Sequence, residues 1–227
     1  MSTFFAEIVN CPYCGEATER SVAHSINATR SPQYRDAILR GEFQNYTCSK
    51  CGQDYLVDRP FIYLDYKTKD WIGVLPLSEE KEWQQWEQAP INAYKFACGA
   101  NAPAVAQSIG EGMKIRTVFG LIALREKLLC LESGLNDVML ELLKFHLILM
   151  PESFVLTEVA RPRLIETDNS TLMFMTPIAA EGSELKYEIV SIDRQAYEEV
   201  ANNQEPWAAF IKELSNGSYV DIGRLIF

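Results

Sequence analysis

The sequence contains two C-x-x-C motifs, each followed directly by glycine: Cys11/Cys14 with Gly15, and Cys48/Cys51 with Gly52. A two-residue spacer lets both thiolates of a pair reach one metal ion from a single tight turn, and Zn²⁺ takes four thiolates in a tetrahedron. The glycine supplies the backbone freedom that such a turn requires. The four cysteines therefore predict one structural zinc ion, although four paired thiolates can also bind iron.

Composition indicates a folded, water-soluble chain. The 227 residues are 48% hydrophobic and 11% aromatic, which is enough for a sizeable core. Charged residues interrupt every long apolar stretch, so no membrane span is expected. The N-terminus lacks the basic start and apolar centre of a secretory signal. Together with the paired thiols, these features favour a reducing compartment, the cytoplasm.

The charge distribution disfavours nucleic acid as a partner. The formal net charge is −10, and nearly all of the excess lies after residue 60. A phosphate backbone is repelled by such a surface unless a basic patch overcomes it, and the sequence has no run of Lys or Arg.

The pattern of residues 1–77 predicts a zinc-ribbon-like β module with one short helix. β-Branched and aromatic residues lead into the first cysteine motif, and Ser31-Pro32 is typical of a helix start. We expect a helix over 33–40 and strands over 4–9, 43–47, 54–57, 61–66 and 71–75.

Residues 78–150 predict a helical region. Ser78 precedes acidic residues, as at a capped helix start, and residues 102–109 form a possible short helix. Apolar residues at helical spacing predict helices over 118–132 and from about 135 to 149. The short turn between them favours an antiparallel pair.

Residues 151–227 predict a small α+β tail, which makes the whole chain α+β. Alternating residues and a turn at 168–170 predict strands, and Asp193 is a candidate helix cap. The expected strands are 164–167, 172–176, 185–192 and 219–227, and the expected helices are 194–201 and 206–214.

The motif Cys11-Pro-Tyr-Cys-Gly has the C-P-x-C pattern, and the chain resembles the CpXC family, which is named for it. The resemblance continues through Arg116-Thr-Val-Phe-Gly, Leu124-Arg-Glu-Lys-Leu and Gly134-Leu-Asn-Asp and covers roughly residues 5–145. The second motif lacks the proline. The resemblance implies metal binding and carries no established biochemical activity.

A redox role for Cys11 and Cys14 is an alternative, because Cys-Pro-Tyr-Cys also occurs in glutaredoxins. In that fold a long amphipathic helix follows the motif, whereas here a glycine and a polar stretch follow. Catalytic zinc is a further alternative, but four thiolates leave no position for a reactive water.

The remaining chemically active residues have ordinary structural interpretations. Cys98 and Cys130 are expected to be buried free thiols, and His24 and His146 to be ordinary residues, with His24 at most supporting the metal site. The tryptophans are expected in the core, and the acidic pairs on solvated helix faces.

We therefore expect a protein-interaction or scaffold protein with a structural zinc site and no assigned catalytic residue. Its partner would be another protein or a second copy, bound through the apolar helices between residues 118 and 149. The alternative is an enzyme of unnamed reaction with its active site between the helical region and the tail.

Overall fold

The computed structural model describes residues 2–149, 161–178 and 186–227. The chain divides into two compact units, residues 1–124 and 125–227, and each is described by itself. The domain limits at residues 77 and 150 stay predictions. No helix in the described ranges combines the length and apolar character that a membrane crossing requires.

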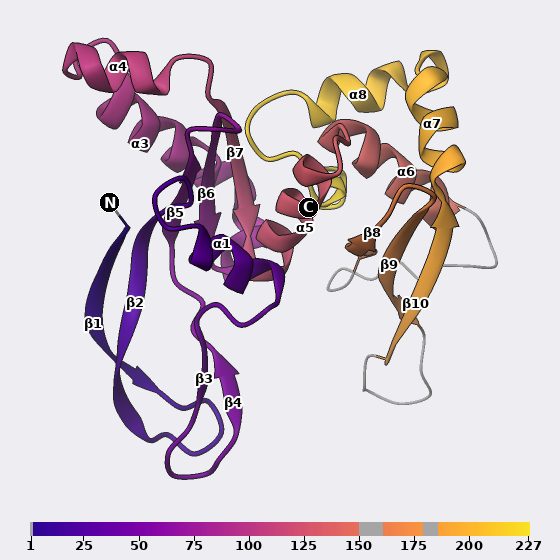
Figure 1. Cartoon of the computed structure of the whole chain (residues 1–227). Helices are drawn as coiled ribbons and strands as arrows, with labels where there is room; N and C mark the ends of the chain where they lie inside the picture. The colour runs from indigo at the N-terminus through magenta and orange to yellow at the C-terminus, as the bar shows by residue number, and fades with distance from the viewer. Residues whose placement is uncertain (1, 150–160, 179–185) are drawn as a thin grey trace. The chain divides into compact units, whose positions relative to one another are not determined.

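The first unit is built on a five-stranded sheet in the order β1-β2-β5-β6-β7 (Figure 1). Neighbouring strands alternate between antiparallel and parallel pairing, starting with the antiparallel β1–β2 hairpin. The strands are β1 (Thr3–Asn10), β2 (Ala17–Asn27), β5 (Phe61–Asp65), β6 (Asp70–Leu75) and β7 (Lys114–Phe119).

The connection from β2 to β5 contains a helix and a second hairpin. Helix α1 (Pro32–Leu39) comes first, followed by β3 (Asn45–Thr47) and β4 (Asp54–Leu56), which pair only with each other. Because β2 and β5 are parallel, the chain must cross from one end of the sheet to the other. The hairpin that carries the second cysteine motif is therefore an insertion in this crossover.

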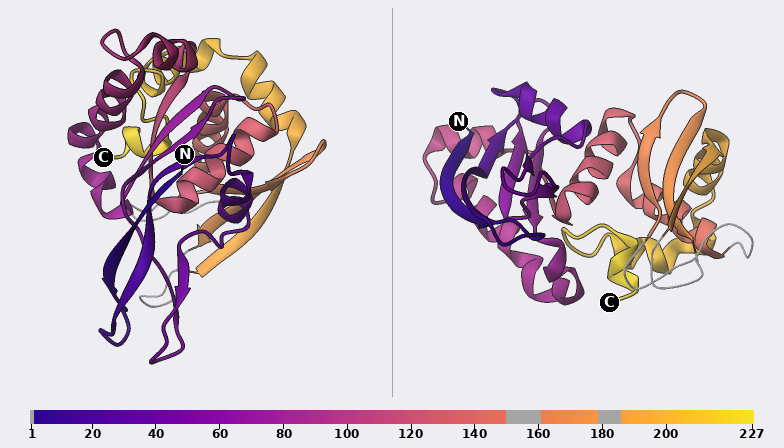
Figure 2. Two further views of the ribbon diagram at one scale, coloured as in Figure 1. Left: turned by 60° about the vertical axis from the view of Figure 1, so that its left-hand side comes forward. Right: turned by 90° about the horizontal axis from the view of Figure 1, so that it is seen from below.

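Helices cover both faces of the sheet (Figure 2). Tyr34 of α1 reaches Phe43, which packs on Phe61 of β5. On the other face, Gly73 allows the close approach of α3 (Gln88–Cys98), because a Cβ at that position would lie 2.0 Å from Pro90 Cγ. Before and after α3 come a 3₁₀ turn (Leu77–Glu82), α2 (Trp83–Trp86) and α4 (Ala104–Gly110).

The second unit packs helices on a three-stranded antiparallel sheet, β10-β9-β8. Buried residues of the sheet, including Leu164, Leu172 and Phe174, join one apolar cluster with those of α6. The strands are β8 (Arg163–Thr167), β9 (Thr171–Ile178) and β10 (Lys186–Asp193), and the helices α6 (Asp137–Leu149), α7 (Arg194–Asn202) and α8 (Ala208–Leu214). Helix α5 (Gly120–Glu132) spans the limit between the units.

The α+β class is confirmed, as are the expected helices near 33–40, 118–132, 135–149, 194–201 and 206–214. Four local predictions were wrong. No strand was expected where β2 and β7 lie, and the strand expected over 219–227 is absent, since that segment contains a 3₁₀ turn (Ile222–Leu225). Ser78 does not cap a helix. The start of the tail, residues 151–160, lies outside the described residues.

Candidate metal centre

The four cysteines of the two motifs lie at the ends of two neighbouring hairpins. Cys11 and Cys14 occupy the turn between β1 and β2, and Cys48 and Cys51 occupy the turn between β3 and β4 (Figure 1). The structure therefore brings together all four cysteines that were predicted to bind the metal.

The two turns have the same backbone hydrogen bonds. The amide of Gly15 donates to the carbonyl of Cys11, and that of Gly52 donates to the carbonyl of Cys48, each at 2.9 Å. Both glycines have positive φ angles, +73° and +71°, which favour a residue without Cβ. The amide of Cys11 donates to the carbonyl of Glu16, and the amide of Cys48 donates to the carbonyl of Gln53. Each motif is thus a preformed two-thiol turn.

The sulfur positions match a tetrahedral site. The Sγ atoms of Cys11 and Cys51 are 3.7 Å apart and those of Cys14 and Cys48 3.6 Å apart, and the four sulfurs lie within 4.8 Å of one another. A tetrahedron with metal–sulfur bonds of about 2.3 Å has edges of about 3.8 Å. A disulfide would require about 2.0 Å, and all four cysteines are free thiols. The four cysteines are close enough to hold a metal ion.

The thiols of the four cysteines differ in their pKa values. Hydrogen bonds from the backbone amides of Cys51 and Lys50 lower the pKa of Cys48 to about 6. For Cys14, a backbone hydrogen bond from Glu16 lowers the pKa, but burial and the neighbouring cysteines outweigh it and raise the pKa to about 12. A cation at the centre of the four sulfurs would stabilise all four thiolates, so metal binding must release protons.

The donor set is closed. Two of the ligand candidates, Cys11 and Cys48, are buried at 2% exposure and form part of a small apolar cluster with Val9, Val22, Tyr55 and Val57. His24 lies elsewhere, with its ring 5.4 Å from that of Phe5. Among the residues that the structure describes, no His, Asp or Glu joins the four cysteines in this group. Four thiolates fit a structural ion and leave no open position for a substrate.

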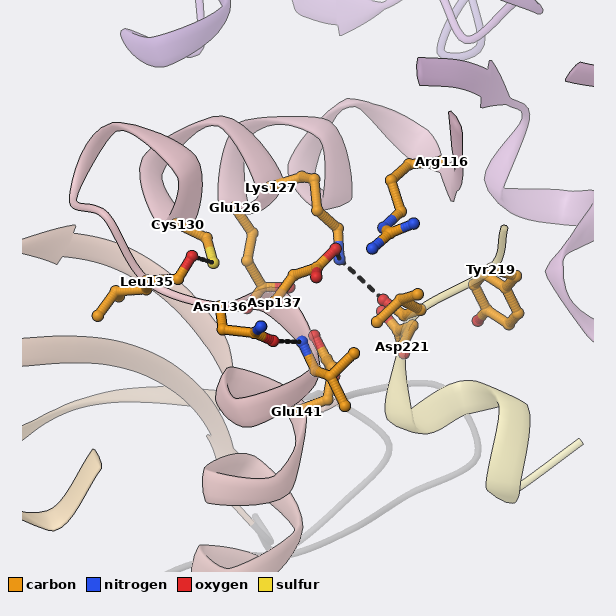
Figure 3. Close-up of polar contacts among 12 residues, drawn as sticks. Arg116, Glu126, Lys127, Cys130, Leu135, Asn136, Asp137, Glu141, Tyr219 and Asp221 are labelled. Atoms are coloured by element: carbon orange, nitrogen blue, oxygen red, sulfur yellow. Dashed lines mark hydrogen bonds and ion pairs between the residues drawn. The ribbon is translucent and has the colours of Figure 1, made fainter. Parts of the chain in front are cut away.

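A second group of acidic residues lies in the second unit, where Glu126, Glu141 and Asp221 bring carboxylate oxygens together (Figure 3). Cationic side chains already neutralise this group. Lys144, which is fully buried, donates to Glu126 at 3.0 Å and to Glu141 at 3.0 Å. Arg163 donates to Glu126 and to Asp221 at 2.7 and 2.6 Å. The ammonium and guanidinium groups occupy the positions that a metal would need.

Charges and burial oppose each other in this ion network. Burial raises the pKa of Glu126, but Lys144 and Arg163 outweigh it and hold the pKa below its ordinary value. For Glu141 burial prevails over Lys144 and raises the pKa to about 7. The network also fixes the backbone near the C-terminus, because the amide of Ile222 donates to Glu141 at 2.9 Å.

The ion network was not foreseen from the sequence, because charges on helices usually face water. A signal existed in α6, where Glu141 lies between Leu140 and Leu142, and Lys144 lies between Leu143 and Phe145. Glu80, expected on a solvated face, is also buried at 7% exposure. Cys130 is buried, as expected, and its thiol lies 3.6 Å from the carbonyl oxygen of Leu135. Cys98, also expected to be buried, is only half-buried.

The tryptophans are mainly core residues, as expected. Trp71 and Trp83 are buried, Trp207 is half-buried beside Phe145, and Trp86 lies partly exposed. His146 packs edge-on against the ring of Trp207. None of these residues lies in the four-cysteine cluster.

No curated protein and no solved structure matches the chain. The model of one protein family, CpXC (CpXC protein), matches residues 9–144. This match includes all four clustered cysteines and more than half of the sequence. The chain belongs to the CpXC family.

Proposed function

We propose that the protein binds one structural zinc ion through Cys11, Cys14, Cys48 and Cys51 and acts as a protein-interaction or scaffold protein in the cytoplasm. The arrangement of the four sulfurs, with edges of 3.6 and 3.7 Å, carries the zinc assignment. The family match and the paired turns support it. A redox pair within one motif is less well supported, because these two short sulfur contacts join different motifs.

The metal content of the purified protein tests this proposal. We expect one zinc per chain and one accessible thiol, Cys98, because Cys130 is fully buried and burial raises its pKa to about 12. Elemental analysis and thiol titration measure both quantities, and unfolding with a chelator should expose all six thiols. Protein without metal but with a Cys11–Cys14 disulfide would contradict the proposal and support a redox role. Protein with bound iron would mean that the structural ion is iron and not zinc.

The helices between residues 118 and 149, which we expected to bind the partner, have mostly buried apolar side chains. In α6, nine residues are buried, among them Leu140, Leu142 and Leu143, and in α5 Leu124 and Leu128 are buried as well. Only isolated apolar side chains of these helices, such as Ile122 and Leu149, are exposed. We therefore place the partner surface elsewhere.

The first unit offers a different apolar surface beside α3. Two adjoining hollows of about 420 and 380 Å³ share His24, Ile62 and Ala93 in their linings. Phe96 lines the second hollow, yet its side chain is 91% exposed. A protruding aromatic beside an apolar hollow is a typical anchor and pocket of a protein interface.

The occupant that we propose is a second copy of the chain. A two-fold interface places the same patch on both sides, so the patch must carry its own complement. Here Phe96 of one copy would fill the hollow of the other copy, and the reverse. Two copies with a net charge of −10 can associate only through a surface that does not bring acidic side chains face to face. The described lining of the second hollow has no acidic or basic residue besides His24, and in the first Glu7 pairs with Arg59 at 3.5 Å.

Substitution of Phe96 tests the self-association. We expect the native protein to exceed 25.8 kDa in light scattering as concentration rises, and the Phe96→Ser variant to stay at the monomer mass. The physical reason is the loss of the aromatic anchor, while zinc content stays unchanged. Tyr187→Ser, at an exposed aromatic residue of β10 in the second unit, is the control. A native mass of 25.8 kDa at every concentration would contradict self-association and leave the zinc proposal intact.

A further inference from the structure

We infer that Arg20 positions the second hairpin for metal binding, so that the metal affinity of the four cysteines depends on a residue that is not a ligand. This inference rests on the proposed zinc site. It concerns how β2 and β3 are held side by side, since the two strands are not neighbours in any of the sheets.

Side-chain contacts replace the missing backbone ladder between β2 and the segment around β3. Toward the cysteines, these contacts join successive residues of two segments that run antiparallel to each other. The amide of Ala23 donates to buried Gln44 at 2.8 Å, the hydroxyl of Tyr46 donates to the carbonyl of Ser21 at 2.8 Å, and Arg20 donates to the carbonyl of Thr47 at 2.9 Å. The last of these contacts lies directly beside Cys48.

Arg20 holds both strands of the second hairpin. Its Nη2 atom donates to Thr47 of β3, and its Nε atom donates to the hydroxyl of Tyr55 in β4 at 3.1 Å. The guanidinium also lies over the Tyr46 ring, 4.8 Å from the centroid, where a cation is attracted to the π face. A planar, forked cation can make these contacts together, whereas the single ammonium of lysine cannot.

The consequence for the metal site is pre-organisation. Thr47 precedes Cys48 and pairs with Asp54 across the hairpin, so its carbonyl sets the position of the second cysteine turn. Contacts that order both turns before the metal arrives reduce the ordering required on binding, which raises affinity. Residues that orient metal ligands without binding the metal typically change affinity about 10- to 100-fold when substituted.

Another charged contact between the hairpins serves as the control. Lys50 pairs with Glu16 at 3.0 Å, but the two side chains are 62% and 39% exposed. Exposed ion pairs contribute little because water and salt screen them. Lys50 lies nearer to the cysteines in sequence than Arg20, so a purely electrostatic effect on the thiolates would make Lys50→Met the more damaging change.

The experiment measures zinc affinity of the full-length chain by competition with a chelator of known affinity. We expect Arg20→Met to weaken zinc binding about 10- to 100-fold, Arg20→Lys to restore little of it, and Lys50→Met to change it far less. Cobalt absorption shows whether the four-thiolate tetrahedron still forms in each variant. Hydrogen exchange in β5 and β6 reports whether the sheet itself is unaffected.

Unchanged affinity in Arg20→Met, or a larger loss in Lys50→Met, would overturn the inference. Should Arg20→Met fail to fold, Tyr55→Phe removes one acceptor of Arg20 and keeps the buried ring. The zinc affinity of Tyr55→Phe is expected to fall as well, and an unchanged affinity would overturn the inference. A native protein that binds no zinc would instead reject the proposed function itself.

Discussion

A Cys11→Ser variant is expected to lose its zinc and the stable order of the two cysteine-bearing hairpins. Zinc contributes roughly 10–16 kcal/mol of apparent binding free energy to folding in small zinc modules at neutral pH. The cluster around the site is small, and Cys11 and Cys48 are themselves part of it, so little apolar burial remains without the metal. Elemental analysis and hydrogen exchange of residues 8–22 and 45–57 measure the two effects.

The loss should stay local. β5, β6 and β7 pack against α1 and α3 with their own buried residues, among them Tyr63, Ile72 and Phe119. Cys98→Ser is the matched control, because Cys98 lies in the same unit and outside the cluster. One zinc per chain in Cys11→Ser, with unchanged exchange in the hairpins, would be incompatible with the closed four-cysteine site.

Substitution of Lys144 by methionine is expected to destabilise the second unit by about 3–5 kcal/mol, because it leaves the buried carboxylates of Glu126 and Glu141 without their shared cation. The methionine fills nearly the same space, so the loss reports charge rather than volume. Hydrogen exchange of residues 137–149 measures it. Lys212→Met, at an exposed lysine of α8, is the control. A loss as small as that of the control would contradict an ionised network.

The loss should depend on pH with a definite sign. Lys144 is the charge that most opposes burial at both carboxyl groups. Without it, the folded-state pKa of Glu141, already about 7 against the ordinary 4.5, rises further, and the pKa of Glu126 rises as well although Arg163 still opposes the rise. Carboxyl groups with raised folded-state pKa values bind protons more tightly in the folded state. Their stabilising effect is therefore present in acid and is lost as the pH rises through those values. The difference from the native protein should be smallest near pH 5 and largest near pH 8.

The metal centre was predictable because its information is local. Two cysteines, a two-residue spacer and a glycine with positive φ define each turn without reference to the rest of the fold. The sequence also predicted that the four thiols of the two motifs lie together, and the structure confirms that they do. It could not show the contacts of Arg20, since these depend on the placement of two strands that share no backbone ladder.

The missed strands lack the usual alternation for physical reasons. β2 extends beyond the end of β5 and pairs only with β1 over most of its length. Its first residues are therefore largely exposed on both faces. β7 runs directly into α5 at Gly120, and its apolar end reads as the start of that helix. Local patterns carry little information where burial is decided by distant segments.

The error at residues 219–227 has a similar origin. Apolar residues there suggest a strand, but the side chain of Asp221 accepts from the amide of Gly223 at 2.7 Å and starts a 3₁₀ turn. The same carboxylate is bound by Arg163 in the ion network. A buried charge partner distant in the sequence thus outweighs the local β preference.

The insertion of the second hairpin between β2 and β5 gives the metal a topological effect. Parallel strands require a long connection, and the entropy lost on closing a loop increases with its length. A metal ion held by Cys14 and Cys48 would join the turn before β2 to a point inside that connection. Only the segment from Cys51 to β5 would then remain to be closed, which would lower the effective contact order of the sheet, a property that correlates with slow folding.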